Sequence, residues 1–233
     1  MPQVYDQGQL GSCVANATAA CISYMANKLH GHFYDGSRLF MYFNGRAIDS
    51  IVDNDPTELT TDCGLYIHSG CQAVVNYGLV NDATTYPYNI AKYAFLPPDA
   101  IYIAAAVNKS LTYTLLNKNL TTLQTSLNNN IPFIFGINAF STIFSAPNGA
   151  IPMPATNAKS IGGHCIVAVG YVPANTTVSG GFSGGTGGVF IIRNSWGTSW
   201  GNKGYGTLPY AYMLSSNAYE PIAITGFTPT NTN

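Results

Sequence analysis

The stretch YDQGQLGSCVANATAA, residues 5–20, places a cysteine where a glycine-containing loop meets a predicted helix. From Cys13 to about Leu29 there is no glycine or proline, and apolar residues recur at helical spacing around much of the circumference. Gly31 supplies a stop signal, so a largely buried helix is expected. Cys13 is therefore either a small apolar residue that opens a buried helix or a nucleophile, because a helix N-terminus stabilises a thiolate.

The loop before Cys13 carries a second group that bears on this choice. Gly8 and Gly11 allow the backbone to turn tightly. Gln7 offers an uncharged amide donor close to the cysteine in sequence. Such a donor can stabilise an oxyanion that forms beside a nucleophilic sulfur, which favours the catalytic interpretation of Cys13.

His164 is the histidine whose surroundings indicate chemistry. In IGGHCIVAVGY, residues 161–171, two glycines precede it and a buried-looking strand follows, which holds the ring at the end of a sheet. A core histidine with satisfied hydrogen bonds is the alternative. The other three histidines are interpreted as helix-end, surface or capping residues, and no spacing suited to a metal site accompanies them: His30, His32 and His68.

The segment IIRNSWGTSWGNKGYG, residues 191–206, adds the remaining groups. Asn194 ends an apolar strand, and its side chain can fix the tautomer of a histidine base. Trp196 supplies a bulky indole that would keep water away from that bond. A cysteine, an amide donor, a histidine and an asparagine together form a complete set for acyl transfer.

Composition excludes several other functions. Charged residues make up only 8% of the chain and the formal net charge is -1, so no basic surface for nucleic acid or for an anionic membrane is expected. No apolar run is long enough to span a bilayer. The first residues, MPQVYDQGQ, lack a signal-peptide pattern, and the cysteine count of 5 is odd. These features favour an intracellular or virion-associated protein over a secreted one.

The order of patterns along the chain predicts a helical half followed by a β half. Ser37 begins a second helical pattern, a third covers about Ser69 to Tyr77, and LTTLQTSLNN predicts a short helix. LPPDA is interpreted as a turn. Strands are expected in FIFGI, HCIVAVGYV, GVFIIRNSW and GYGTLPYAYM. The glycine-rich residues 179–188 lie between two of these runs, so a hairpin loop is favoured over a phosphate site.

Three blocks, DQGQLGSC, GGHCIVAVGY and RNSWGTSWGNKGYG, resemble the papain-like cysteine peptidases. LGSCVANATAA, SRLFMYFNGR, NYGLV, YPYN and PYAYM look most like the xylellain-like branch of that family, found in bacteria, archaea and some viruses. The resemblance implies an α+β, two-lobed papain-like fold in a single peptidase domain, residues 1–233. A mainly helical lobe is expected at about 10–100 and an antiparallel β-barrel-like lobe at about 110–215, with the active-site cleft between them. The N-terminal residues and the C-terminal tail would cross between the lobes.

The resemblance also implies roles for individual residues. Cys13 would attack the scissile carbonyl, His164 would protonate the leaving amine, Asn194 would orient His164, and Gln7 with the Cys13 N–H would hold the oxyanion. Trp196 would support this group. The residues implied to contact an extended peptide or protein substrate are Gly64, Leu65, Tyr66 and Gly163. No metal or other cofactor is implied, and a monomer is expected.

Two departures from the family pattern affect the thiols. Leu10 stands where many members have a cysteine that forms a disulfide, so Cys63 lacks that partner, and Val14 replaces a tryptophan. Cys63 and Cys71 are expected to be mainly reduced, with a bond between them as the alternative. Two other functions stay open from the sequence. The same residues would serve an acyl transferase, transglutaminase-like or peptide-ligating enzyme, and a non-catalytic peptide-binding homologue would keep the fold.

Overall fold

The computed structural model describes residues 1–230, and residues 231–233, which the predicted single domain includes, lie outside the described part. Within that part the chain divides into two compact units. The first unit contains residues 1–3, 7–114 and 224–230, and the second contains residues 4–6 and 115–223. Neither unit is therefore one continuous stretch of sequence.

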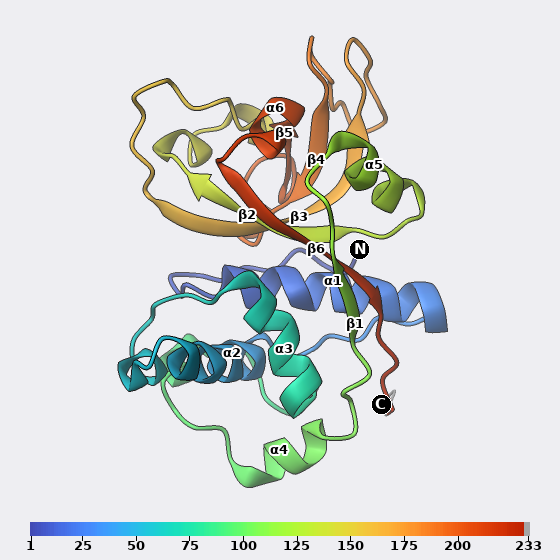
Figure 1. Cartoon of the computed structure of the whole chain (residues 1–233). Coiled ribbons are helices and arrows are strands. Elements are labelled where there is room, and N and C mark those ends of the chain that lie inside the picture. The colour runs from blue at the N-terminus through green and yellow to red at the C-terminus, as the bar shows by residue number, and fades with distance from the viewer. Residues whose placement is uncertain (231–233) are drawn as a thin grey trace. The chain divides into compact units, whose positions relative to one another are not determined.

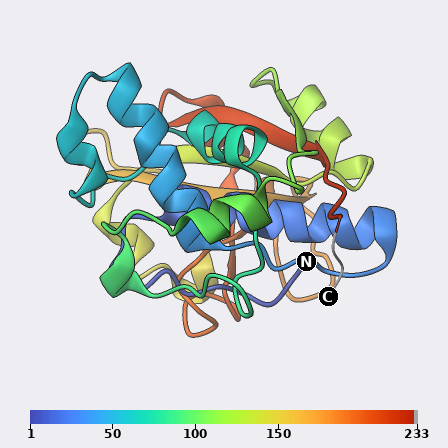
Figure 2. The ribbon, with the colours of Figure 1, turned by 90° about the horizontal axis from the view of Figure 1, so that it is seen from below.

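The first unit is mainly helical. Figures 1 and 2 show α1 as its longest helix, with α2 and α3 packed near it. The order confirms the predicted helical half. The helices are α1 (Cys13–His30), α2 (Arg38–Val52), α3 (Ile67–Tyr77) and α4 (Asp99–Ala105), with short 3-10 turns at Pro56–Leu59 and Ile90–Lys92.

The ends of α1 and α2 follow the sequence signals. Gly31 has a φ of 80° and caps α1 in the left-handed conformation, which glycine adopts without strain. The Ser37 side chain accepts a hydrogen bond from the Phe40 N–H at 3.2 Å and so caps α2. Because α1 is buried around most of its circumference, residues such as Asn16 have almost no exposed surface. α1 is therefore the predicted buried helix.

The second unit is built on an antiparallel sheet. Within residues 1–230 the strand order is β1-β6-β2-β3-β4-β5, and the far end of β6 continues into the first unit. The strands are β1 (Thr112–Leu115), β2 (Phe133–Ala139), β3 (Gly162–Val172), β4 (Val189–Arg193), β5 (Tyr205–Pro209) and β6 (Ala218–Gly226). Helix α5 (Leu120–Asn128) lies against β3 (Figure 1). Short 3-10 turns at Ser141–Ile143 and Pro147–Gly149 follow β2.

A continuous apolar core fixes this sheet. Phe133, Phe135 and Phe190 are fully buried, and the Phe133 ring contacts both of the others. Aliphatic residues of β2, β3 and β4 join the same cluster. Each fully buried large side chain contributes about 1.5 to 3 kcal/mol, so the strand register is strongly specified. The core thereby sets the position of every residue in β3 and β4.

Four elements differ from the sequence expectations. PYAYM, predicted as strand, forms helix α6 (Tyr210–Leu214), because Pro209 ends the ladder and precedes a helical turn. LPPDA, predicted as a turn, leads into α4. β1 and β6 were not predicted as strands. β1 has only four residues, and β6 contains Pro221 and a Glu220 with a φ of 50°.

Other features bear on the predicted interactions. Cys63 is an exposed thiol without a disulfide partner among the described residues. Residues 179–188 lie in the loop 173–188 that joins the antiparallel strands β3 and β4, as predicted for a hairpin. In the portion of the chain that the structure covers, no helix is both long and apolar enough to cross a bilayer.

Candidate active site

His164 and Asn194 form the best-defined polar pair of the second unit. His164 lies in β3 opposite Ile137 of β2, and Asn194 directly follows β4. His164 Nε2 lies 2.8 Å from Asn194 Oδ1, and both side chains are buried. An amide oxygen only accepts hydrogen bonds, so Nε2 carries the proton and Nδ1 is the basic nitrogen of the neutral ring.

The Asn194 side chain is itself fixed. Its Oδ1 also accepts the Ser195 N–H at 2.8 Å, and its backbone N–H donates to Gly204 O at 3.0 Å. Its Nδ2 is buried without a hydrogen-bond partner in residues 1–230. The oxygen is therefore the end of the amide that does the binding, which keeps the imidazole in one orientation.

Trp196 covers this pair. Its ring stacks on the His164 ring, with 4.7 Å between the ring centroids. It also stacks on the Phe144 ring, with 5.3 Å between the centroids. Trp200 meets Trp196 edge to face at 6.0 Å, and the Trp200 indole N–H donates to Ile143 O at 3.0 Å. The indole thus packs directly on the imidazole, and Phe144 is a further contact that the sequence did not indicate.

Burial decides the charge of the imidazole. It lowers the pKa of His164 from 6.5 to about 4, and the hydrogen bond to Asn194 opposes the change only in part. At neutral pH the ring is therefore uncharged and able to accept a proton at Nδ1. A neighbouring anion, such as a thiolate, would raise the pKa.

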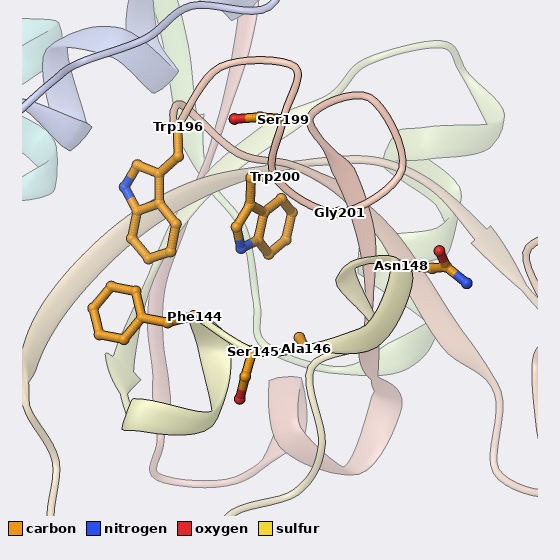
Figure 3. A pocket seen from close by; sticks show the side chains of 8 residues that line it. All are labelled: Phe144, Ser145, Ala146, Asn148, Trp196, Ser199, Trp200 and Gly201. Carbon is orange, nitrogen blue, oxygen red and sulfur yellow. The ribbon is translucent and has the colours of Figure 1, made fainter.

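An open pocket of about 510 Å³ adjoins the covering indole. Figure 3 shows Phe144 and Trp196 on one side of it and Asn148 on the other, with Trp200 between them. Its remaining lining residues are small or carry hydroxyls: Ser145, Ala146, Ser199 and Gly201. Its size and its aromatic wall suit part of a peptide.

Cys13 is the first residue of α1 in the first unit and is partly exposed. Ser12, at the N-cap position, is buried and uses its hydroxyl to meet Tyr88 Oη at 2.5 Å. The first turn is closed by Asn16, whose N–H and Nδ2 both donate to Ser12 O. The thiol thus stands at a well-fixed helix N-terminus, the position that favours a thiolate.

Gln7 lies in the same loop and is buried. Its Nε2 donates to Leu10 O at 3.0 Å, which fixes the amide within the turn before Cys13. Tyr88 Oη donates to Gln7 O at 2.9 Å, so one phenol binds both ends of the loop. Tyr88 belongs to the YPYN stretch, but its role could not be predicted because its partners lie far away in sequence.

The predicted substrate segment, residues 64–66, also lies in the first unit. The Gly64 N–H donates to Tyr42 Oη at 3.3 Å, and the Tyr66 N–H donates to Asp49 Oδ2 at 2.9 Å. The Leu65 N–H has no partner among the described residues, and the Leu65 side chain packs on Gly45. Leu65 thus differs from its two neighbours, whose N–H groups are both donated to side chains.

Gly163, the remaining predicted contact, is exposed in β3 directly before His164. A Cβ there would lie 2.9 Å from Tyr219 Oη. Within each unit the predicted residues are therefore neighbours. The first unit groups Gln7 and Cys13 in one loop and carries residues 64–66, and the second groups the rest: Gly163, His164, Asn194 and Trp196.

The first unit is helical and has a cysteine at the start of its longest helix. The second unit is an antiparallel sheet with a histidine bound to an asparagine. Together these features indicate the class of thiol hydrolases. The family described as papain family cysteine protease matches residues 1–219. The chain belongs to this family. The predicted family membership is confirmed.

Individual relatives support the same assignment. Xylellain, a cysteine protease from Xylella fastidiosa, has a similar structure with a TM-score of 0.78 and 28% identity, covering 97% of this chain and 84% of that one. The α+β papain-like fold is thus confirmed. An uncharacterized peptidase C1-like protein of Acanthamoeba polyphaga mimivirus is 32% identical over 91% of this chain and 66% of its own length. Cysteine proteinase 3 of Entamoeba histolytica is 30% identical over 86% and 57%. The chain spans between about half and two thirds of these curated relatives.

Proposed function

We propose that this chain is a cysteine endopeptidase that hydrolyses peptide bonds through Cys13, with residues 1–233 acting as one peptidase domain. The observation that carries the proposal is the buried His164–Asn194 hydrogen bond of 2.8 Å under the Trp196 ring, in a chain of the papain family. That bond leaves Nδ1 as the basic nitrogen, which is the property a general base needs. The mechanism requires Cys13 Sγ to reach Nδ1.

The first half of the reaction forms an acyl-enzyme. His164 Nδ1 takes the Cys13 thiol proton, which gives a thiolate and an imidazolium, and the thiolate attacks the scissile carbonyl carbon. The oxyanion that results is held by Gln7 Nε2 and the Cys13 N–H. The C–N bond then breaks while the imidazolium gives its proton to the leaving amine. A thioester on Cys13 and a neutral His164 remain.

The second half returns the enzyme to its starting state. His164 takes a proton from water, the hydroxide attacks the thioester carbonyl, and the same donors hold the second oxyanion. The C–S bond breaks, the acid product leaves, and the proton on His164 returns to Cys13 Sγ. Asn194 acts by holding the ring, so its contribution is to orientation.

Substrate is proposed to bind in an extended form. The Leu65 N–H is the backbone donor we assign to it, with Gly64, Tyr66 and Gly163 lining its path. The pocket beside Trp196 and Phe144 is proposed to take residues on the leaving-group side, because it adjoins the ring that covers His164. A peptide would thus be held on both sides of the bond that is cut.

The test is covalent labelling by a thiol-directed epoxide, followed by intact mass and peptide mapping. One label is expected on Cys13 in the parent chain and in Cys63→Ser, which removes the exposed thiol as a matched control. Labelling should vanish in Cys13→Ala and slow in His164→Ala. An unlabelled Cys13 in folded, reduced protein would contradict the proposal.

Product analysis separates hydrolysis from acyl transfer. A fluorogenic peptide library with and without an added primary amine is expected to give free carboxylates as the main products. If amide products exceed the free acids, the chain is an acyl transferase that uses the same residues, and the proposed hydrolase activity is wrong.

A further inference from the structure

The loop that leads to Cys13 is tied to a distant acidic residue. The Gly11 N–H donates to both carboxylate oxygens of Asp62, each at 3.0 Å, across a sequence separation of 51. A Cβ at position 11 would lie 2.9 Å from Asp62 Oδ1. The absence of a side chain at Gly11 is therefore what lets the carboxylate bind the backbone two residues before the cysteine.

A buried phenol holds the carboxylate from the other side. Tyr42 of α2 is fully buried and its hydroxyl donates to Asp62 Oδ1. Burial raises the pKa of Tyr42, and the adjacent Asp62 carboxylate raises it further, so the phenol keeps its proton and stays a donor. The Tyr42 hydroxyl oxygen also accepts a hydrogen bond from the Gly64 N–H at 3.3 Å. One phenol thus joins Asp62 to the proposed substrate segment.

Arg46, one helical turn beyond Tyr42, fixes the backbone on the other side of Asp62. Its guanidinium is fully buried, lies 4.4 Å from the centre of the Tyr42 ring, and donates to Thr61 O at 2.9 Å. α2 therefore presents two side chains that hold the backbone just before and just after Asp62. The arrangement is local to the first unit. Tyr42 and Arg46 are fully buried, whereas Asp62 and its two hydrogen bonds to Gly11 are exposed.

We propose that Asp62 is the positioning residue of the nucleophile loop, and that Tyr42 couples this loop to the substrate segment at Gly64. The proposal rests on the proposed function of Cys13. Asp62 acts through the Gly11 backbone, so it sets where the thiol and the Cys13 N–H stand without touching substrate. Misplacement of a reacting group by about 1 Å can cost on the order of a hundredfold in rate.

The experiment compares Asp62→Ala, Asp62→Asn and the control Asp55→Ala, all in a Cys63→Ser background. Asp55 is exposed in the same region, and within the described part of the chain its side chain accepts hydrogen bonds from the nearby Thr57 alone. Peptide cleavage and alkylation of Cys13 by iodoacetamide, which needs no substrate segment, are measured together. Asp62→Ala is expected to lower both kcat and the alkylation rate about tenfold, Asp62→Asn about threefold, and Asp55→Ala not at all.

Two further variants separate the links. Gly11→Ala is expected to reproduce Asp62→Ala, because the new Cβ displaces the carboxylate. Tyr42→Phe keeps the ring beside Arg46 but removes the hydroxyl, so KM should rise as well as kcat fall. All rates are taken well below the unfolding temperature of the least stable variant, with circular dichroism to establish that each one is folded.

Distinct results overturn the two proposals. Parent-like kcat and alkylation in folded Asp62→Ala would show that Asp62 does not position the loop. A parent Cys13 that neither reacts nor supports cleavage would instead overturn the proposed function. In that case hydrogen exchange at the Gly11 amide still decides the structural part, since protection lost in Asp62→Ala but kept in Asp55→Ala supports the link and unchanged protection refutes it.

Discussion

Cys13 stands at the end of a loop, whereas His164 stands inside a strand with a register partner in β2. The loop is held by polar groups from elsewhere in the first unit: Gln7 binds within it, Tyr88 binds both its ends, and Asp62 binds Gly11. The strand is held by backbone pairing and by an apolar core. The proposed nucleophile thus depends on hydrogen bonds between distant residues, and the proposed base depends on packing.

The difference predicts opposite sensitivities. Hydrogen-bonded loops lose position when one donor or acceptor is removed, because the partner is left unsatisfied. A sheet with a packed core resists single polar changes and responds to loss of volume.

Arg46→Met should produce the largest loss of stability. The buried guanidinium donates to the carbonyl oxygens of Glu58, Leu59, Thr61 and Tyr93, and methionine removes all four of these interactions. The free energy of unfolding should fall by about 4 kcal/mol, measured by urea denaturation. Lys92→Met, at an exposed site of the same unit, is the control and should change it by less than about 0.5 kcal/mol. An equal change in the free energy of unfolding for both variants would mean that the hydrogen bonds of Arg46 do not stabilise the first unit.

The second prediction concerns the pH dependence of stability in Cys13→Ala. The pKa of His164 is about 4 in the folded chain and 6.5 in a free side chain, so the unfolded chain binds the extra proton between these values. Stability should therefore be full above pH 6.5 and be lost as the pH falls toward 4, by about 3 kcal/mol. Urea denaturation across this range measures the slope.

The control is the double variant Cys13→Ala with His164→Gln, in which the free energy of unfolding should change less between pH 6.5 and pH 4. NMR titration of His164 gives a second measure. In the parent chain the proposed Cys13 thiolate would raise the pKa of His164 above its value in Cys13→Ala. An identical titration in both chains would count against a thiolate–imidazolium pair.

Asn194→Ala is expected to lower kcat about a hundredfold, equivalent to about 2.7 kcal/mol, with little change in KM. The reason is that the ring loses the acceptor that fixes its tautomer while the core around it stays packed. Steady-state kinetics on one peptide gives both constants. The control is Asn202→Ala, in the loop between β4 and β5, which should leave kcat and KM nearly unchanged. A rise in KM with unchanged kcat would place Asn194 in substrate binding instead.

The smallest effect is expected for Phe144→Ala. Phe144 stacks on Trp196 and lines the adjoining pocket, so its loss should raise KM about threefold to fivefold for peptides extended on the leaving-group side. Phe95→Ala is matched in exposure, since both rings are 65% exposed. If the two variants give the same KM, the pocket does not take part in substrate binding.

The sequence predicted the elements that depend on local signals. α1 opens at Cys13 and ends at Gly31, Ser37 caps α2, and the apolar runs of β2, β3 and β4 form strands. α6 was wrong because aromatic residues favour strands, while Pro209 and the tertiary context made five residues helical. β1 has no buried residue and so gives no pattern, and in β6 Pro221 interrupts the strand signal.

Of the candidate site, sequence reasoning found the residues with distinctive neighbours and missed their supports. His164 lies near the start of β3, and Asn194 follows the end of β4. Because β3 and β4 pair antiparallel, these two ends lie side by side, which allows the hydrogen bond between the two side chains. Asp62, Tyr42 and Tyr88 look like ordinary polar residues in the sequence, because their hydrogen-bond partners lie 20 or more positions away.

The discontinuous make-up of the units has a consequence for how the protein is made. The helical unit contains Asn108 and Ser110, and each of them bonds to a threonine synthesised 122 or 118 residues later, at Thr230 and Thr228. The β unit in turn includes Tyr5, whose carbonyl accepts the Gly197 N–H at 3.0 Å. A ribosome must therefore emit almost the whole described chain before either unit has all its parts. On this account the proposed nucleophile and its base would mature together, only after residues 197–230 have been synthesised.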